Sequence, residues 1–278
     1  MTSTDTDSDA KPMVIIDGQP VNIFSPVQAL TDIITELKTR RDSFLACTLN
    51  VDHLVKLRSD DAFRAAYSKA RFVTADGFPI VMLARVRGHS IQRTTGSDLI
   101  VPLCQAAASA GYSIFLLGST DDTLAKAAQY LKQNCPGLEI AGMAAPPYGF
   151  DPTSDMASRM ADTIAASGAR LCLVALGAPL QERFSAHAME LTRGVGFMGV
   201  GASLDFFSGR QQRAPKLVQS LNMEWAWRLF SNPRRLWLRY AKCGALVMEL
   251  LWNEILTTLF LLRNKKAMRD TDSRGLSP

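Results

Sequence analysis

The sequence has few histidines and no closely spaced cysteines. It contains three histidines in 278 residues, and none stands at metal-ligand spacing from His53. The five cysteines are isolated along the chain: Cys47, Cys104, Cys135, Cys172 and Cys243. An odd number of scattered cysteines without a CxxC pair argues against a zinc site and against a disulfide framework. We therefore expect no metal centre and a reducing, cytoplasmic location.

The common nucleotide-binding motifs are also missing. No Walker A loop is present, which argues against a P-loop NTPase. The stretch Gly199-Val200-Gly201-Ala202-Ser203 is similar to a dinucleotide fingerprint, but it lacks the third glycine and falls late in the chain. No GxGxxG motif follows the first strand, which argues against a nucleotide-sugar dehydrogenase or epimerase.

No uninterrupted hydrophobic run is long enough to predict a membrane-spanning helix. The most apolar stretch, residues 245–262, is broken by Glu249, Asn253 and Glu254. Such a segment is more typical of a helix that lies in the membrane plane or packs on the protein. Residues 1–12 are polar and acidic without an apolar core, so we expect a disordered tail and no secretory signal. We expect a second disordered tail over residues 264–278.

Between these tails, residues 13–209 alternate between strand and helix patterns. Asp17-Gly18 predicts a hairpin turn between two short strands, at residues 13–16 and 21–24. Further strands are predicted at residues 44–47, 71–75, 113–117, 138–143, 170–176 and 196–200, with helices between them. This alternation predicts an α/β fold with a Rossmann-like, mostly parallel sheet flanked by helices.

The pattern changes after residues 208–213, where we place a domain boundary. From Arg210 onward the chain carries 13 Lys/Arg against 5 Asp/Glu, whereas the preceding residues hold 18 against 21, and all four tryptophans lie between residues 225 and 252. Residues 210–263 therefore predict a basic, amphipathic helical appendage, with basic side chains on one helix and an apolar stripe over residues 248–262 on the next. The positive charge could simply form a solvated helix face, or it could bind anionic lipid or nucleic acid. Tryptophan interleaved with arginine favours an anionic membrane surface over nucleic acid.

Polar residues follow two of the predicted strands where each ends. Thr48 and Asn50 close the strand that begins at Phe44, and Asp76 closes the next one. Ligands of open parallel sheets bind at the carboxyl ends of the strands, so these side chains should share one edge. Asp76 could be a general base or only a turn residue before Gly77. Asn50 could hydrogen-bond a sugar diphosphate or only cap a helix.

Two further sequences contain candidate polar residues at predicted helix starts. Gln181 and Glu182 follow Gly177-Ala178-Pro179-Leu180, where Gln181 could contact a nucleotide-sugar or the segment could simply begin a helix. The helix after Arg93-Thr94-Thr95-Gly96 is predicted to be capped by Ser97 or Asp98. His53 is more typical of a structural histidine than of a catalyst.

Six ordered motifs, taken together, resemble a known family. They are Thr48-Leu49-Asn50 with His53-Leu54, Ala75-Asp76-Gly77, Arg93-Thr94-Thr95-Gly96-Ser97-Asp98, Phe115-Leu116-Leu117-Gly118, Gly177-Ala178-Pro179-Leu180-Gln181-Glu182, and Gly199-Val200-Gly201-Ala202 with Phe206-Phe207-Ser208-Gly209. In this order they are similar to the bacterial WecG/TagA/CpsF glycosyltransferases, family 26, from about Val14 to Tyr240. The family often has proline or another small residue in place of Leu49.

The resemblance implies an inverting, metal-independent transferase that needs no cofactor. It would move a sugar from a UDP-sugar to a polyprenyl-diphosphate-linked sugar, working as a peripheral protein on the inner face of the plasma membrane. The extension past Tyr240 leans toward the GumM-like exopolysaccharide type, and other members serve teichoic acid or enterobacterial antigen. The alternative is a membrane-tethered nucleotide-binding protein without transferase activity.

The resemblance also assigns roles to individual residues. Asp76 matches the general base, and Thr48 the threonine beside it. Arg93 and Gln181 match substrate-binding positions. The expected substrate site is completed by Asn50, Gly77, Asp98, Glu182 and Gly201, with Arg228, Arg234, Arg235 and Arg239 of the appendage folding over it to meet the diphosphate.

Overall fold

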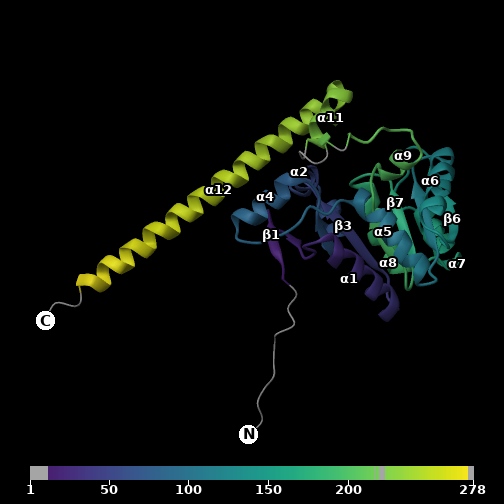
Figure 1. Cartoon of the computed structure of the whole chain (residues 1–278), viewed down its shortest axis with the longest axis horizontal. Helices are drawn as coiled ribbons and strands as arrows, with labels where there is room; N and C mark the ends of the chain where they lie inside the picture. The colour runs from purple at the N-terminus through teal and green to yellow at the C-terminus, as the bar shows by residue number, and fades with distance from the viewer. Residues whose placement is uncertain (1–11, 216, 219–222, 275–278) are drawn as a thin grey trace, which may run out of the picture.

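The centre of the protein is a six-stranded parallel sheet. The structure, a computed structural model, describes residues 12–215, 217–218 and 223–274. The sheet has the order β4-β3-β8-β7-β5-β6 (Figure 1). Its strands are β3 (Phe44–Leu49), β4 (Ala70–Ala75), β5 (Ile114–Gly118), β6 (Ile140–Ala144), β7 (Leu171–Ala175) and β8 (Gly196–Gly199). Each begins and ends within about two residues of its predicted bounds, so the parallel α/β fold is confirmed.

A small antiparallel hairpin flanks the sheet beside β4. Its strands are β1 (Val14–Ile16) and β2 (Gln19–Val21), joined by Asp17 and Gly18, both at positive φ. The predicted turn is therefore confirmed, but β2 begins and ends earlier than predicted. Ile23 instead forms an isolated parallel bridge with Thr74 of β4.

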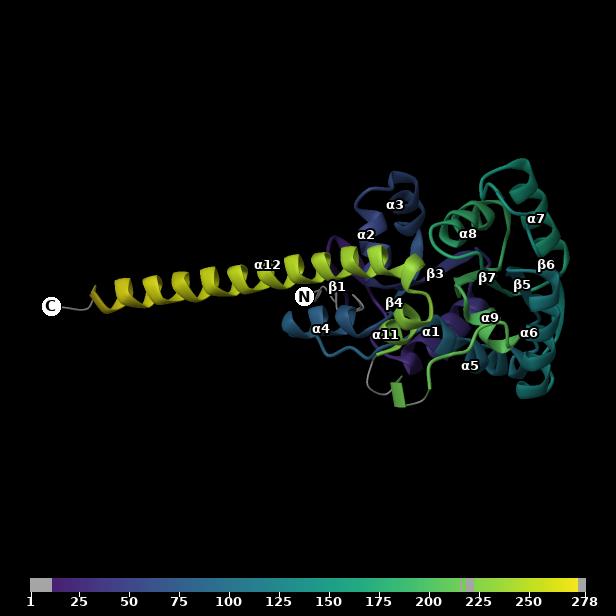
Figure 2. The ribbon, with the colours of Figure 1, turned by 90° about the horizontal axis from the view of Figure 1, so that it is seen from above.

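Helices cover both faces of the sheet, and the sheet divides the core in two (Figure 2). One face carries α2 (Val51–Leu57), α3 (Asp61–Tyr67), α7 (Asp155–Ala166) and α8 (Leu180–Leu191). The other carries α1 (Pro26–Thr39), α5 (Gly96–Ser109), α6 (Asp121–Asn134) and α9 (Ser203–Phe207). Strands β3, β5 and β8 are buried along their whole length because both of their faces meet helices, and this explains their nearly unbroken apolar sequences.

The helix starts follow ordinary capping chemistry. Ser25 caps α1, Asn50 caps α2 and Thr120 caps α6, each by accepting a backbone N–H bond from the first turn. Helix α5 differs from the prediction, because Thr95 caps it in place of Ser97 or Asp98. The helix α4 (Phe78–Val86) starts directly after Gly77 and packs against β1.

The C-terminal part consists of α11 (Glu224–Ser231) and one long helix, α12 (Pro233–Arg274), which projects from the body (Figures 1 and 2). Two predictions are corrected here. The basic and apolar stretches share a single helix, which continues through Gly244 without a break. The segment from residue 264, which was expected to be a disordered tail, continues as helix to Arg274. The predicted N-terminal tail lies outside the described residues, except for Pro12.

Helix α12 is fixed to the core along its first half. Leu246 and Leu250 are buried in the core cluster that includes α2 and α4. Three ion pairs reinforce this contact: Arg239 Nε lies 2.9 Å from Asp52 Oδ1, Glu249 Oε2 lies 2.9 Å from Arg58 Nη1, and Glu254 Oε1 accepts from Arg87 Nε at 2.6 Å. Within the described part of the chain, no helix combines the length and apolar character needed to cross a membrane.

Candidate active site

Asp76 lies at the carboxyl end of β4, the outermost strand of the sheet. Its backbone N–H donates to Leu49 O at 2.8 Å, which aligns the end of β4 with the end of β3. Gly77 then adopts φ +101°, a conformation that favours glycine, and the chain turns directly into α4. Asp76 is thus held between a strand and a helix at the sheet edge where ligands bind. The junction is a strand-to-helix connection, not a reverse turn.

Thr48 and Asn50 end the neighbouring strand, as predicted. Thr48 is buried in β3, in register with Thr74 of β4. Asn50 is half-buried and its side-chain oxygen accepts from His53 N at 2.9 Å, so it is the N-cap of α2. The capping role of Asn50 is confirmed. Its contact with substrate, like that of Thr48, stays a prediction.

The surroundings of Asp76 favour a neutral carboxyl more than water does. Burial raises the pKa of Asp76 to about 6 from its ordinary value of 3.8. Arg228 and Arg93 act in the opposite direction and lower this pKa, whereas Glu224 and Asp98 raise it. Charges from the loop before α5, from α5 and from α11 therefore all converge on Asp76. A carboxylate with a pKa near neutrality can accept a proton in a reaction and release it afterwards.

Four charged side chains form an alternating cluster beside Asp76. Asp98 Oδ1 lies 2.5 Å from Arg213 Nη2, and Asp98 Oδ2 lies 3.8 Å from Arg93 Nη2. Glu224 Oε1 lies 3.3 Å from Arg93 Nη1 and 3.8 Å from Arg213 Nη2. Burial works to raise the pKa of Asp98, but hydrogen bonds from Arg213 and Thr95 outweigh it and hold that pKa below its usual value.

The four arginines predicted from the appendage fall in different places. Arg228 comes from α11, lies over the Phe206 ring at 5.5 Å and is close enough to lower the pKa of Asp76. Arg239 binds Asp52 at the start of α2. Arg234 is exposed at the start of α12. The side chain of Arg235 lies outside the described residues. The structure therefore brings Arg228 to the site, and Arg239 to the neighbouring helix.

Gln181 and Glu182 are buried, in contrast to the surface position that substrate contact requires. Gln181 Oε1 accepts from Gly201 N at 3.0 Å, and its Nε2 donates to Glu182 Oε1 at 2.8 Å. Burial raises the pKa of Glu182 to about 7. Gln181 thus connects α8 to the turn after β8, and Glu182 holds the Gln181 amide in place. Their role in binding substrate, with that of Gly201, stays a prediction, and the geometry supports an internal structural role.

His53 lies in a buried aromatic group, as a structural histidine should. Its ring meets Phe63 and Tyr67 edge-on, with centroids 5.7 and 6.0 Å away. Burial lowers its pKa to about 3, so it is neutral in the folded protein at physiological pH. Burial has the opposite effect on Tyr67, whose charged form is an anion: it raises the pKa of the Tyr67 hydroxyl, and the charge of Asp76 contributes to this shift.

Sequence reasoning missed Arg213 and Glu224 as members of the site. Glu224 is the one acidic residue between Arg210 and Lys242 in the sequence. A single acid in a basic segment was the available signal, because it needs a cationic partner elsewhere.

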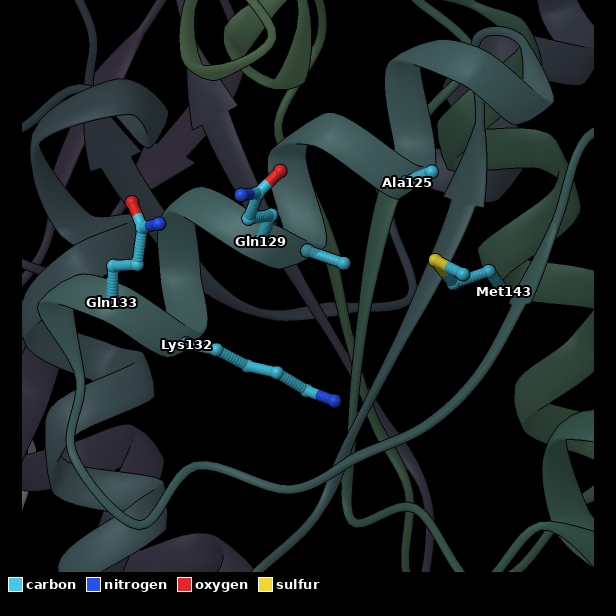
Figure 3. A pocket seen from close by; sticks show the side chains of 6 residues that line it. Ala125, Gln129, Lys132, Gln133 and Met143 are labelled. Carbon is cyan, nitrogen blue, oxygen red and sulfur yellow. The ribbon is translucent and has the colours of Figure 1, made fainter.

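A separate hollow of about 470 Å³ lies between α6 and β6 (Figure 3). It is lined by Ala125, Ala128, Gln129, Lys132, Gln133 and Met143. Since β6 and β4 are the two opposite edges of the sheet, this hollow is distant from Asp76. No carboxylate or histidine that could act as a general base lines this hollow. Among the residues the structure describes, no group of three His, Cys, Asp or Glu side chains could hold a metal ion.

The structure thus has a parallel α/β fold with a carboxyl group of raised pKa, Asp76, among charged side chains at the edge of its sheet. A profile of the Glycosyl transferase WecG/TagA/CpsF family matches residues 14–259. The N-acetylglucosaminyldiphosphoundecaprenol N-acetyl-beta-D-mannosaminyltransferase of Bacillus spizizenii is similar, with 31% identity over 243 residues that cover 85% of this chain and 91% of that enzyme. The chain belongs to the WecG/TagA/CpsF family of glycosyltransferases.

Proposed function

We propose that this protein transfers a hexose or N-acetylhexosamine from a UDP-sugar to a polyprenyl-diphosphate-linked sugar during synthesis of a bacterial surface polysaccharide. The observation that carries the proposal is Asp76, with its pKa raised to about 6 at the sheet edge and Arg228 of α11 brought close to it. The similar Bacillus spizizenii enzyme is named for an undecaprenol-diphosphate acceptor, which supports the same acceptor class here.

The proposed reaction inverts the configuration of the transferred sugar. Asp76 takes the proton from the acceptor hydroxyl as its oxygen bonds to the anomeric carbon, and the bond from that carbon to the diphosphate oxygen breaks. UDP leaves with the bonding electron pair. Negative charge grows on the departing diphosphate, and in this proposal Arg228 and Arg93, whose charges act on Asp76, offset it by charge-assisted hydrogen bonds. These cations supply the charge stabilisation in the proposed mechanism, which uses no metal ion.

The acceptor's lipid tail would remain in the bilayer, so the enzyme must work at the membrane surface. Helices α11 and α12 present a series of exposed apolar side chains that supports this: Trp225, Trp227, Phe230, Trp237, Leu238, Met248, Trp252, Ile255, Leu256 and Phe260. Basic residues accompany them in the sequence. An amphipathic, tryptophan-bearing helix of this type is suited to the interface of an anionic membrane. We propose a peripheral location on the inner face of the plasma membrane.

The transferase proposal is tested by measuring UDP release from a panel of UDP-sugars, including UDP-glucose and UDP-N-acetylmannosamine, with and without a lipid-diphosphate sugar. Acceptor-dependent release with one donor is expected. The Asp76→Asn variant should lose it, whereas Asp122→Asn, the same change at an exposed position on α6, should not. Binding of a UDP-sugar without any acceptor-dependent release would support the non-catalytic nucleotide-binding alternative instead.

The membrane proposal needs its own variants. Removing the appendage would also uncover the core that Leu246 and Leu250 protect, so substitution of exposed residues is the cleaner test. Trp252→Ser with Ile255→Ser should weaken co-sedimentation with vesicles rich in phosphatidylglycerol. Tyr148→Ser, an exposed aromatic residue of the α/β domain, is the matched control. Equal vesicle binding by all three proteins would overturn the membrane proposal.

A further inference from the structure

We infer that Arg213 and Glu224 are positioning residues, which join Arg93 and Asp98 in a four-charge latch that seats α11 so that Arg228 faces Asp76. The four-charge latch means these four side chains and their ion pairs. The inference rests on the proposed function for its catalytic meaning, but the position of α11 can be tested without any activity.

The latch connects two parts of the chain that are distant in sequence. Arg93 precedes α5, and Asp98 is in its first turn, so both belong to the α/β domain. Arg213 comes from the segment after α9, and Glu224 is the first residue of α11. Each carboxylate faces both guanidinium groups, at the distances of 2.5 and 3.8 Å for Asp98 and 3.3 and 3.8 Å for Glu224. The charges thus close a ring, and loss of either appendage residue removes two contacts at once.

Apolar packing alone holds α11 only weakly. Ala226 is its one buried residue, while Trp225, Trp227 and Phe230 are exposed. The four side chains of the latch are 22% to 39% exposed, Glu224 least and Asp98 most. Isolated exposed ion pairs contribute little, but a partly buried network in which every member has two opposite partners is more favourable. Besides its packing on α12, where Trp225 meets the Tyr240 ring, α11 therefore relies on these polar contacts to hold it against the α/β domain.

The helix geometry transmits this position to Arg228. Glu224 and Arg228 are four residues apart on α11, so they lie on the same face of the helix. The Arg228 guanidinium rests over the Phe206 ring at 5.5 Å, which gives the helix a second point of attachment. A displacement of about 1 Å in a catalytic site can lower a rate about 100-fold. Releasing Glu224 should accordingly misplace Arg228.

The activity-independent test measures the distance between α11 and the core by pulsed electron spin resonance. Spin labels at Phe230→Cys and Val27→Cys, both exposed, would be introduced with Cys243→Ser to remove the least buried native thiol. A narrow distance distribution is expected, and Arg213→Gln should broaden it. Arg210→Gln is the matched control, because Arg210 is in the same segment but pairs with Asp205 at 3.9 Å outside the latch. An unchanged distribution in Arg213→Gln overturns the inference.

The catalytic readout is the pH profile of kcat/KM. The charges facing Asp76 are Arg228 and Glu224 from α11, Arg93 from the preceding loop and Asp98 from α5. Arg213→Gln should lower kcat by about 10- to 100-fold. Arg228 lowers the Asp76 pKa more than Glu224 raises it, so displacing both with α11 should move the acidic limb above pH 6. A loss of activity with an unmoved limb and an unmoved helix would overturn the positioning role. Broadened distances in a protein inactive with every donor would support the latch while counting against the proposed function.

Discussion

The substitution Asp76→Asn should make the protein more stable while abolishing its activity. Asparagine keeps the shape of the side chain but removes the charge that the site disfavours. The pKa of Asp76 is about 6 against an ordinary value of 3.8, a difference of roughly two pH units. At about 1.4 kcal/mol per unit, ionised Asp76 destabilises the native state by up to about 3 kcal/mol. Replacing that carboxylate should raise the free energy of unfolding by most of this amount.

The sign of this effect depends on pH. Because the folded-state pKa is raised, the destabilisation is absent below about pH 4, where the carboxyl is protonated in both states. It grows between about pH 4 and 6 and is complete above pH 6. Urea denaturation of both proteins at pH 8 and pH 4 measures it. The variant should be more stable at pH 8, and the two should converge at pH 4.

Activity supplies the second half of the test. General-base catalysis typically contributes about 10²- to 10⁴-fold to a rate, so kcat should fall by this factor. In the parent protein, kcat/KM should decline tenfold per pH unit below about pH 6, as Asp76 becomes protonated. Near-normal turnover in a stabilised variant would show that Asp76 is not the general base. A destabilised variant at pH 8 would show that its carboxylate is favourably paired, contrary to the structure.

Three further predictions concern the supporting structure. Glu182→Gln should stabilise the protein above pH 7 by up to about 3 kcal/mol, because burial raises the Glu182 pKa to about 7, and the gain should vanish below about pH 4.5 in the same denaturation assay. Gly118→Ala should destabilise by at least about 2 kcal/mol, since the added Cβ would stand 2.4 Å from Ala175 O at φ +111°; an unchanged thermal midpoint would contradict this. The buried cysteines should react with Ellman's reagent at pH 8 far more slowly than in urea, as burial raises the pKa of Cys47, Cys104 and Cys172, and rapid native labelling of three thiols would argue against the described core.

Hydrophobic pattern was sufficient to predict the sheet and the location of Asp76. Strands β5 and β7 are buried on both faces, and continuous apolar runs are what such strands require. Once the strands were located, parallel topology alone brought Thr48 and Asp76 to the same edge. The backbone bond from Asp76 N to Leu49 O shows how closely the two strand ends align.

Local sequence could not decide which residues of a polar cluster face inward. Thr95, Ser97 and Asp98 are all suitable caps for α5. Thr95 takes this role, and Asp98 is directed to Arg213, which lies far along the chain. Gln181 and Glu182 look like surface residues at a helix start, yet they bond each other in the interior.

Long-range ion pairs are equally invisible in sequence, because charge alone does not specify a partner. The pair of Arg93 and Glu224 spans 131 residues, and Arg58 and Glu249 are separated by 191. Both depend on where the appendage rests on the α/β domain.

The position of β4 as the last strand has a consequence for how substrates arrive. An acid in the middle of the sheet would be enclosed by neighbouring loops on both sides, and a long chain would have to thread between them. Among the described residues, no further strand of the sheet lies beyond β4, where the small hairpin of β1 and β2 packs beside α4. The proposed lipid-linked acceptor would therefore meet Asp76 from the flank that has no neighbouring strand, with its lipid outside the sheet.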